Sequence, residues 1–166
     1  MHSEIRVIGL DHGIHHTGYG ILIKKQTKIS CLDWGTIDTS PKMVFPKRLQ
    51  KIYEELLEII RRWNPTIMAI EAAIYAQNIK TALLMGHARA CAILAGANSD
   101  LEIFEYSPKK IKSAVVGNGA ASKEQVRFMI TRLLNIHDKN IPFDASDALA
   151  AGFCHLNQMP RQVGVR

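Results

Sequence analysis

The sequence predicts an α/β protein in which helices pack on the faces of one mixed β-sheet. Two observations lead to this prediction. The first third of the chain contains three β-rich segments joined by short polar turns, which is typical of an antiparallel meander. The rest alternates segments of helical periodicity with short apolar runs, which is typical of strands connected through helices. The length of 166 residues fits one domain.

Turn residues separate the three N-terminal strands. Residues 5–10 form a short apolar run that stops at Asp11-His12-Gly13. Residues 18–24 follow, and the polar sequence Lys25-Gln26-Thr27-Lys28 separates them from residues 29–37. Short polar connections of this kind join antiparallel neighbours, so we expect three consecutive paired strands.

A helix and a buried strand come next. Apolar residues recur every three or four positions between Pro46 and Trp63, which predicts an amphipathic helix. Asn64-Pro65 ends this helix, because proline cannot continue the hydrogen-bond ladder. Residues 66–70 are apolar without alternation, as expected for a strand that is buried on both faces, and the strand ends on Glu71.

The second half of the chain continues this alternation of helices and strands. Pro108 fits the first turn of a short helix, where its missing N–H costs nothing. Ser122 and Gln125 have the spacing of a capping box, which predicts the start of another helix. The expected elements are a helix over residues 78–97, a strand over 101–106, a short helix from Pro108, a helix from Ser122 to about Asn135 and a last helix over 144–157.

The composition is that of an ordinary globular protein and excludes disordered and fibrous classes. The net charge of +6 is compatible with a polyanionic partner but is weak evidence for one. The N-terminus lacks a signal peptide pattern, no apolar run is long enough to span a membrane, and the three cysteines are far apart, so we expect a cytoplasmic protein without a membrane partner. Residues 1–157 are expected to form the domain, and 158–166 a short, basic, flexible tail.

Four acidic residues are the candidates for chemistry. Asp11 and Glu71 each follow a predicted strand, and functional groups of open sheets gather at the carboxyl ends of central strands. Asp144 and Asp147 are three positions apart, so on a helix both project from one face. Clustered carboxylates repel one another unless a cation lies between them, and Mg²⁺ prefers carboxylate oxygens. The pattern is therefore compatible with a site for a divalent cation.

Each acid also has a purely structural interpretation. Asp11 in the sequence Asp11-His12-Gly13 is typical of a turn. Asp144 followed by Asp147 is typical of a helix N-cap with an acid in the first turn. Glu71 closes a buried apolar strand, where an acid is costly without a partner, and its two interpretations are balanced. Composition and spacing leave both interpretations open for the group.

From Ile5 to about His155, the sequence closely resembles the bacterial RuvC family of Holliday-junction resolvases, or crossover junction endodeoxyribonucleases. Each matching segment is short, but together they follow the family's order and spacing. The segments are Gly9-Leu10-Asp11-His12-Gly13, Thr17-Gly18-Tyr19-Gly20, Ile70-Glu71, Ala76-Gln77-Asn78, Gly86-His87-Ala88-Arg89, Phe104-Glu105-Tyr106-Ser107-Pro108, Lys112, Val115-Val116-Gly117-Asn118-Gly119-Ala120, Lys123 and Asp144-Ala145-Ser146-Asp147-Ala148-Leu149-Ala150.

The resemblance implies a ribonuclease-H-like mixed five-stranded sheet, an antiparallel three-stranded meander plus parallel strands, flanked by helices. The implied reaction is hydrolysis of DNA phosphodiester bonds that depends on two Mg²⁺ ions, or on Mn²⁺ in their place, and yields paired symmetric nicks. The implied partners are four-way junction DNA, a second copy in a homodimer and a branch-migration helicase complex. The implied site consists of the metal-binding catalytic acids Asp11, Glu71, Asp144 and Asp147 and the phosphate-contacting or transition-state-contacting Lys112 and Lys123.

Two regions depart from the family pattern. His12 stands where the family usually has proline, and His15 and His16 follow closely. Three histidines in one loop without a distant partner cluster are expected to be solvated loop residues and not zinc ligands. The aromatic residue with which the family unstacks bases aligns with Ile74, and Tyr75 follows it. Either could act as the apolar wedge, and the alternative for Tyr75 is simple packing.

Positive charge concentrates between residues 109 and 139, where seven basic residues meet only Glu124 and Asp138. This segment is either a footprint for the DNA backbone or a solvated helix surface. The helix over 78–97 carries a stripe of small residues, which fits either its own sheet or a second copy of the chain. The expected DNA contacts are Ile74, Tyr75, Asn78, Lys80, Arg89, Lys109, Lys110, Lys112, Lys123 and Arg127.

Three functions are compatible with these residues. The first is a structure-selective endonuclease that resolves Holliday junctions in DNA recombination and repair. The second is a junction-binding protein with impaired catalysis, and the third is another ribonuclease-H-like nuclease that acts on branched DNA or RNA–DNA hybrids. The four acids favour an enzyme, and the match at Lys112, Gly117-Asn118-Gly119 and Lys123 favours the first function.

Overall fold

A five-stranded mixed sheet forms the centre of the computed structural model, which describes residues 4–72, 78–138 and 140–159. The spatial order is β3-β2-β1-β4-β5. β1 pairs antiparallel with β2 and β2 with β3, whereas β4 and β5 run parallel to β1. The predicted meander with parallel strands is therefore confirmed. The strands are β1 (Ile5–Asp11), β2 (His16–Lys25), β3 (Lys28–Asp38), β4 (Ile67–Glu71) and β5 (Glu102–Tyr106).

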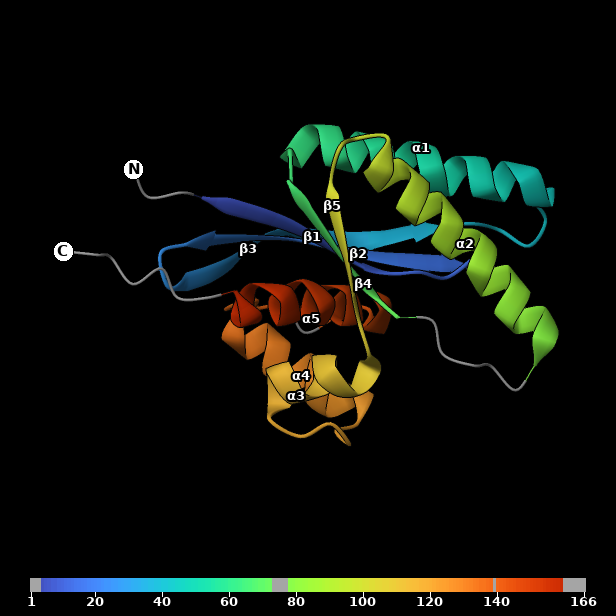
Figure 1. Ribbon diagram of the computed structural model, residues 1–166. Coiled ribbons are helices and arrows are strands. Elements are labelled where there is room, and N and C mark those ends of the chain that lie inside the picture. Colours follow the sequence, from blue (N-terminus) through green and yellow to red (C-terminus); the bar gives the residue numbers. More distant parts are fainter. Residues whose placement is uncertain (1–3, 73–77, 139, 160–166) are drawn as a thin grey trace.

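Helices cover the two faces of the sheet as separate layers (Figure 1). One layer holds α1 (Phe45–Trp63) and α2 (Ile79–Ala97). The other holds α5 (Phe143–Gln158), with α3 (Pro108–Val116) and α4 (Lys123–Leu133) packed against it. Successive strand residues point to opposite faces, so neighbouring residues of β1 belong to different hydrophobic cores. Val7 packs with Leu149 of α5, and Ile8 packs with Ile52 of α1.

Local sequence determines where several helices begin and end. Asn64 adopts a left-handed conformation with φ of 48°, and its N–H donates to the carbonyl of Ile60 at 2.8 Å, which ends α1 before Pro65. The Ser122 hydroxyl accepts from the N–H of Gln125 at 3.2 Å, and the Gln125 side chain accepts from the N–H of Ser122 at 2.8 Å. The predicted end of α1 and the predicted capping box of α4 are both confirmed.

Helix α5 lies directly on β1 and β2, with its backbone against theirs. A Cβ atom added to Gly9 would overlap the carbonyl oxygen of Ala148, and one added to Gly18 would overlap the carbonyl of Asp144. Gly18 is also the residue opposite Asp11 in the β1–β2 register. The absence of a side chain on these strand glycines therefore lets α5 approach the sheet where the candidate acids lie.

Two boundary questions concern the membrane and the C-terminus. Within the three described ranges, no helix is long and apolar enough to cross a lipid bilayer. Helix α5 extends to Gln158, the first residue of the expected tail, and residues 160–166 lie outside the described residues.

We expect Gly18→Ala to lower the free energy of unfolding by about 1–3 kcal/mol or more, because the new methyl group overlaps helix backbone that cannot rotate away. Urea unfolding followed by circular dichroism measures this change. Gly86→Ala on α2 is the matched control, since a Cβ there meets nothing within 4 Å and alanine favours a helix by about 0.5–1 kcal/mol. Equal stability of Gly18→Ala and the unaltered protein would contradict the close contact.

Candidate active site

The four candidate acids come from three elements that meet at one edge of the sheet. Asp11 and Glu71 are the last residues of β1 and β4, which are parallel neighbours, so both lie at the same sheet edge. Asp144 and Asp147 lie in the first two turns of α5, the helix that packs across β1 and β2. The charges of all three other acids act on Asp11, so the structure brings the predicted group together.

The start of α5 rules out one alternative for Asp144. The helix begins at Phe143, its N-cap is Pro142, and no side chain caps it. The interpretation of Asp144 as the N-cap is therefore wrong, and its carboxylate is not used to close the helix end. Asp144 remains an acid in the first turn, where the helix dipole favours negative charge.

Burial and mutual repulsion raise the pKa values of the acids. The pKa of Asp11 is raised to about 8, first by burial and then by the charges of Asp147, Glu71 and Asp144. Burial also raises the pKa of Glu71, with a further contribution from Asp147. The pKa of Asp147 is raised by burial, although Lys123 opposes the increase. Negative charge at this edge is therefore costly unless a proton or a cation accompanies it.

Two lysines supply positive charge to the acids. Lys123, the first residue of α4, places its ammonium 3.3 Å from a carboxylate oxygen of Asp147. Burial alone would lower the pKa of Lys123, but the charge and hydrogen bond of Asp147, together with the charges of Asp11 and Asp144, raise it overall. Lys112 of α3 is close enough for its charge to lower the pKa values of Glu71 and Asp147. The two predicted lysines thus lie beside the four acids.

The donor set fits a hard divalent cation. Four carboxylates are the oxygen ligands that such ions prefer, and the pKa of Asp11, raised by burial and by the other acids despite Lys123, means that a further positive charge would be favourable here. As the side chains stand, no three His, Cys, Asp or Glu residues in the described part of the chain are arranged to hold a metal ion. The Lys123 ammonium instead provides the positive charge beside Asp147.

His12 differs from the prediction. It is only 5% exposed, so the expectation that it is a solvated loop residue is wrong, whereas His15 and His16 are exposed. Burial, followed by the positive charge of Arg89, lowers the pKa of His12 to about 4. His12 is therefore a neutral, buried residue at neutral pH, directly after the candidate acid Asp11.

The expected DNA contacts fall into three groups. Lys109 and Lys110 are exposed on α3, Lys80 is exposed on α2, and Asn78 caps α2 by accepting from the N–H of Thr81. Arg127 and Arg89 are engaged within the protein: the Arg127 guanidinium stacks 3.9 Å from the ring centroid of Phe143, and Arg89 forms an ion pair with Glu105 of β5. Ile74 and Tyr75 lie outside the described residues.

Sequence reasoning missed the buried Arg48 of α1. Its guanidinium donates to the carbonyl of Ile14 at 3.1 Å and to the hydroxyl of Thr39 at 2.8 Å, and it lies 3.0 Å from Nδ1 of His15. Arg48 therefore holds the turn that follows Asp11. The available signal was its position four residues before Ile52, on the apolar face of the helix.

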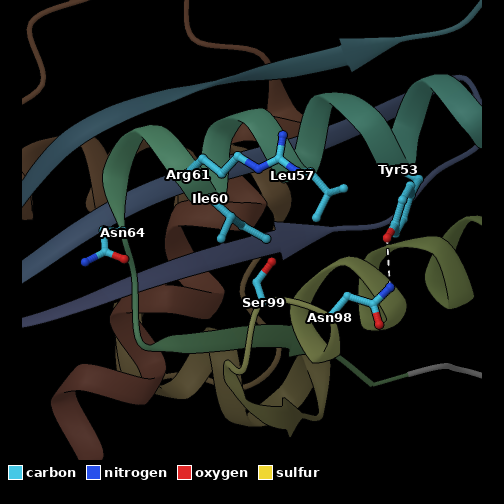
Figure 2. Close-up of a pocket in the computed structure, with 7 residues that line it drawn as sticks. All are labelled: Tyr53, Leu57, Ile60, Arg61, Asn64, Asn98 and Ser99. Atoms are coloured by element: carbon cyan, nitrogen blue, oxygen red, sulfur yellow. Dashed lines mark hydrogen bonds between the residues drawn. The ribbon is translucent and has the colours of Figure 1, made fainter.

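A pocket lies between the C-terminal ends of α1 and α2, far along α2 from its cap Asn78 (Figure 2). Asn98 donates to the hydroxyl of Tyr53 at 2.8 Å across its rim. Its lining contains no acid and no residue predicted for the site, so it does not belong to the acid cluster. The lining residues are Tyr53, Leu57, Ile60, Arg61, Asn64, Asn98 and Ser99.

Comparison with known proteins places this geometry in context. The family model described as crossover junction endodeoxyribonuclease RuvC matches residues 7–155. The RuvC protein of Alkaliphilus oremlandii is 45% identical over 149 residues, which cover 90% of this chain and 91% of that protein. The RuvC protein of Desulforamulus reducens is 40% identical over 149 residues, which again cover 90% of this chain and 91% of that protein.

Solved structures agree with the sequence comparison. The structure of Thermus thermophilus RuvC in complex with a Holliday junction substrate superposes with a TM-score of 0.86 at 29% identity, and covers 92% of this chain and 93% of that one. The yeast mitochondrial Holliday junction resolvase has a TM-score of 0.62 at 18% identity, covers 92% of this chain and 77% of its own, and shows the fold alone. The predicted ribonuclease-H-like fold is confirmed.

We expect the stability of the metal-free protein to fall as pH rises through neutrality. Because the pKa of Asp11 is about 8 in the folded protein and 3.8 without its surroundings, the folded state holds an extra proton between these values. This contribution is fully present below about pH 4 and is lost as the pH rises through about 8. Burial shifts Glu71 and Asp147 in the same direction.

Thermal unfolding in a chelator, measured from about pH 5 to about pH 8.5, tests this expectation. Asp11→Asn should remove most of the decrease in Tm, since the amide needs no proton to be neutral. Glu58→Gln, which changes an exposed acid on α1, should leave the decrease intact. A pH profile of Asp11→Asn that matched the unaltered protein would show that Asp11 does not carry the extra proton.

Proposed function

The chain belongs to the RuvC family of crossover junction endodeoxyribonucleases and is an endonuclease that resolves Holliday junctions, and from this premise we propose that Asp11, Glu71, Asp144 and Asp147 form its catalytic centre. The observation that carries the proposal is the convergence of the four acids where β1, β4 and α5 meet, with Lys112 and Lys123 beside them. The reaction is hydrolysis of a DNA phosphodiester bond.

The family implies the use of a divalent metal, and we propose Mg²⁺, with two ions per site, or Mn²⁺ in its place. The four carboxylates would hold the ions. When bound, such ions stabilise negative charge on the attacking and leaving oxygens. The acids themselves exclude phosphate from a metal-free site by repulsion, because phosphate and carboxylate have the same sign of charge.

The lysines orient the phosphate. Lys123 stands at the N-terminus of α4, where free backbone N–H groups also favour an anion, and its side chain is 65% exposed despite the contact with Asp147. The side chain of Lys123 can therefore rotate from Asp147 to a phosphate while the backbone of α4 stays in place. Lys112 of α3 adds a second positive charge near Glu71, which would also attract the phosphate.

The DNA backbone would lie over the α3–α4 side of the site. Lys109 and Lys110 are exposed there, and the Arg127 guanidinium lies over the ring of Phe143, the residue before Asp144. Asn78 and Lys80 stand on the other side, at the start of α2. We also propose that Ile74 or Tyr75 unstacks bases at the junction; both lie outside the described residues.

A second copy of the chain would bind through α2. Ile79 is 78% exposed and Leu83 is 60% exposed, which is unusual for apolar residues one helical turn apart, and Gly86 adds open space on the same helix. A two-fold dimer would present two sites to the two-fold symmetric junction and so make paired symmetric nicks. We further propose action in the cytoplasm together with a branch-migration helicase complex.

A cleavage assay on a synthetic four-way junction, a linear duplex and an RNA–DNA hybrid, each with and without Mg²⁺, tests the activity. We expect paired symmetric nicks confined to the junction and only with metal, because two symmetric sites must engage two strands together. Equal cutting of the linear duplex would contradict a resolvase, and cutting of the hybrid would favour another ribonuclease-H-like nuclease. Binding without cutting would identify an impaired junction-binding protein.

We expect Asp11→Asn to lower the single-turnover cleavage rate by more than about 100-fold. Mutating a residue that only hydrogen-bonds to a metal ligand already lowers metal affinity or activity roughly 10- to 100-fold, and Asp11 would be a ligand itself. Junction affinity measured without metal should stay the same or increase, because the substitution removes a negative charge near phosphate. The control is Asp33→Asn on β3. The Asp33 carboxylate accepts a hydrogen bond from the Trp63 indole and does not belong to the acid cluster. Wild-type cleavage by Asp11→Asn would show that the site is assigned wrongly.

A further inference from the structure

The half of α2 nearest the active site extends beyond the sheet (Figure 1). The buried residues of this helix are Ala88, Ala92, Ala95 and Gly96, and all belong to its C-terminal half. Residues 79–87, which we name the α2 overhang, are exposed or half-buried. Within the overhang, Leu84 packs against the core between α1 and α2, and the ring of His87 meets that of Phe45 of α1 with centroids 5.3 Å apart. These contacts come from the α1 side, so the direction of the overhang relative to the strands also depends on the next contacts along the helix.

Arg89 ties the helix to the sheet next to the overhang. Its guanidinium forms an ion pair with Glu105 of β5, its side chain is 18% exposed, and its Nε is buried. Glu105 pairs in register with Ile70, so it lies one position before the level of Glu71 on the neighbouring strand. The contact joins one terminal nitrogen of the guanidinium to one carboxylate oxygen, and the low exposure of the arginine side chain restricts its other conformations, so the pair links α2 to β5 at a defined place.

The ion pair lies behind the catalytic acids, on the opposite face of the same sheet edge. Tyr106 packs in the α5 core, so strand alternation directs its neighbour Glu105 toward α2. His12 follows Asp11 and is buried close enough to Arg89 and Glu105 for both charges to act on it. The ends of β1 and β4 therefore carry the acids on one face of the sheet, and β5, which pairs with β4, carries the anchor of α2 on the other face.

We propose that Arg89 is a positioning residue, whose ion pair with Glu105 fixes the direction of the α2 overhang relative to Asp11 and Glu71. This rests on the proposed function, because the overhang acts through the junction and the second subunit that it would contact. Ile79 lies ten residues from Arg89, about 15 Å along the helix axis, so a tilt of about 4° moves it by about 1 Å. A misplacement of about 1 Å can cost on the order of 100-fold in rate.

The competing role for Arg89 is the direct DNA contact expected from the sequence. A phosphate would then have to replace Glu105 as the partner of the guanidinium. The two roles differ in what the loss of Glu105 does. For a DNA contact, Glu105→Gln frees the arginine and leaves binding unchanged or tighter, whereas for a positioning residue it has the same effect as the loss of Arg89.

The experiment compares Arg89→Met, Glu105→Gln and the exchanged pair Arg89→Glu with Glu105→Arg, in the full-length protein. For the two single variants we expect the single-turnover rate on a four-way junction to fall about 10- to 100-fold. Metal-free junction affinity should stay within about twofold, because no phosphate contact is lost. The exchanged pair should regain most of the rate, and hydrogen exchange of amides 79–87 should be faster only in the single variants.

Other outcomes would overturn the positioning role of Arg89. Arg89 would be a DNA contact if Arg89→Met alone lowered junction affinity and also reduced the slope of log K against log salt concentration by about 1. Lost stability with unchanged rate, or an exchanged pair that regains nothing, would leave the pair a structural contact and overturn the proposal. Lys80→Met, which removes an exposed lysine on the overhang, is the control for a phosphate contact.

Glu105→Gln keeps the shape of the side chain, and Glu105 is already 48% exposed, so this variant tests the proposal even where Arg89→Met folds poorly. If the unaltered protein fails to cut junctions, the proposed function fails. Hydrogen exchange of the overhang and its recovery in the exchanged pair would still decide the positioning role, since neither measurement depends on cleavage.

Discussion

The contact between the backbone of α5 and the glycines of β1 and β2 is the constraint on which the active site depends. Side chains hold most helices at 8–10 Å or more from their neighbours, but Gly9 and Gly18 let α5 rest on the strands themselves. Asp144 is held by this contact through its own carbonyl group, opposite the strand position of Asp11. The distance between helix acids and strand acids is thus set by main-chain packing, which is stiffer than any arrangement of side chains.

Charge follows from that geometry. Once four carboxylates are forced together in a partly buried place, their cost must be offset, and the structure shows two of the available means. The pKa of Asp11, raised to about 8, favours retention of a proton at neutral pH, and the Lys123 ammonium lies 3.3 Å from a carboxylate oxygen of Asp147. Both are weaker and more mobile partners for carboxylates than a divalent cation, so the same edge is suited to accept metal and release them. The cluster is therefore costly as a purely structural feature and is compatible with the catalytic role proposed for it.

The sequence alone predicted the parts of the molecule that depend on local patterns. The short polar turns of the meander, the Asn64-Pro65 stop and the Ser122–Gln125 capping box each act within a few residues, and all three appear as expected. The convergence of the acids was a hypothesis from strand ends and helix spacing, and it needed the family resemblance to become specific. Residues whose state depends on distant neighbours were the ones that sequence patterns misassigned.

His12 and Arg48 show why such residues escape a reading of one chain. His12 follows a strand in a polar-looking turn, yet it is buried, and the charge of Arg89 on α2, more than seventy positions later, acts on it. Arg48 lies on the apolar face of α1, where a charged residue is unexpected, and its partners are backbone and hydroxyl groups of the β1–β2 turn and the end of β3. Neither partner set can be inferred from spacing, because both are created by the packing of the α1–α2 layer on the sheet.

The two faces of the sheet edge therefore carry different tasks. On the α5 face, successive strand ends present Asp11 and Glu71 to the acids of the helix. On the opposite face, the adjacent positions His12 and Glu105 meet Arg89 of α2, while Arg48 fixes the turn that follows Asp11. Because His12 directly follows Asp11, a shift at the end of β1 would move both residues, whereas Glu105 is linked to Glu71 through the pairing of β5 with β4. The candidate acids and the proposed anchor of α2 are thus held on opposite faces of neighbouring strands, so the backbone of the sheet links the two.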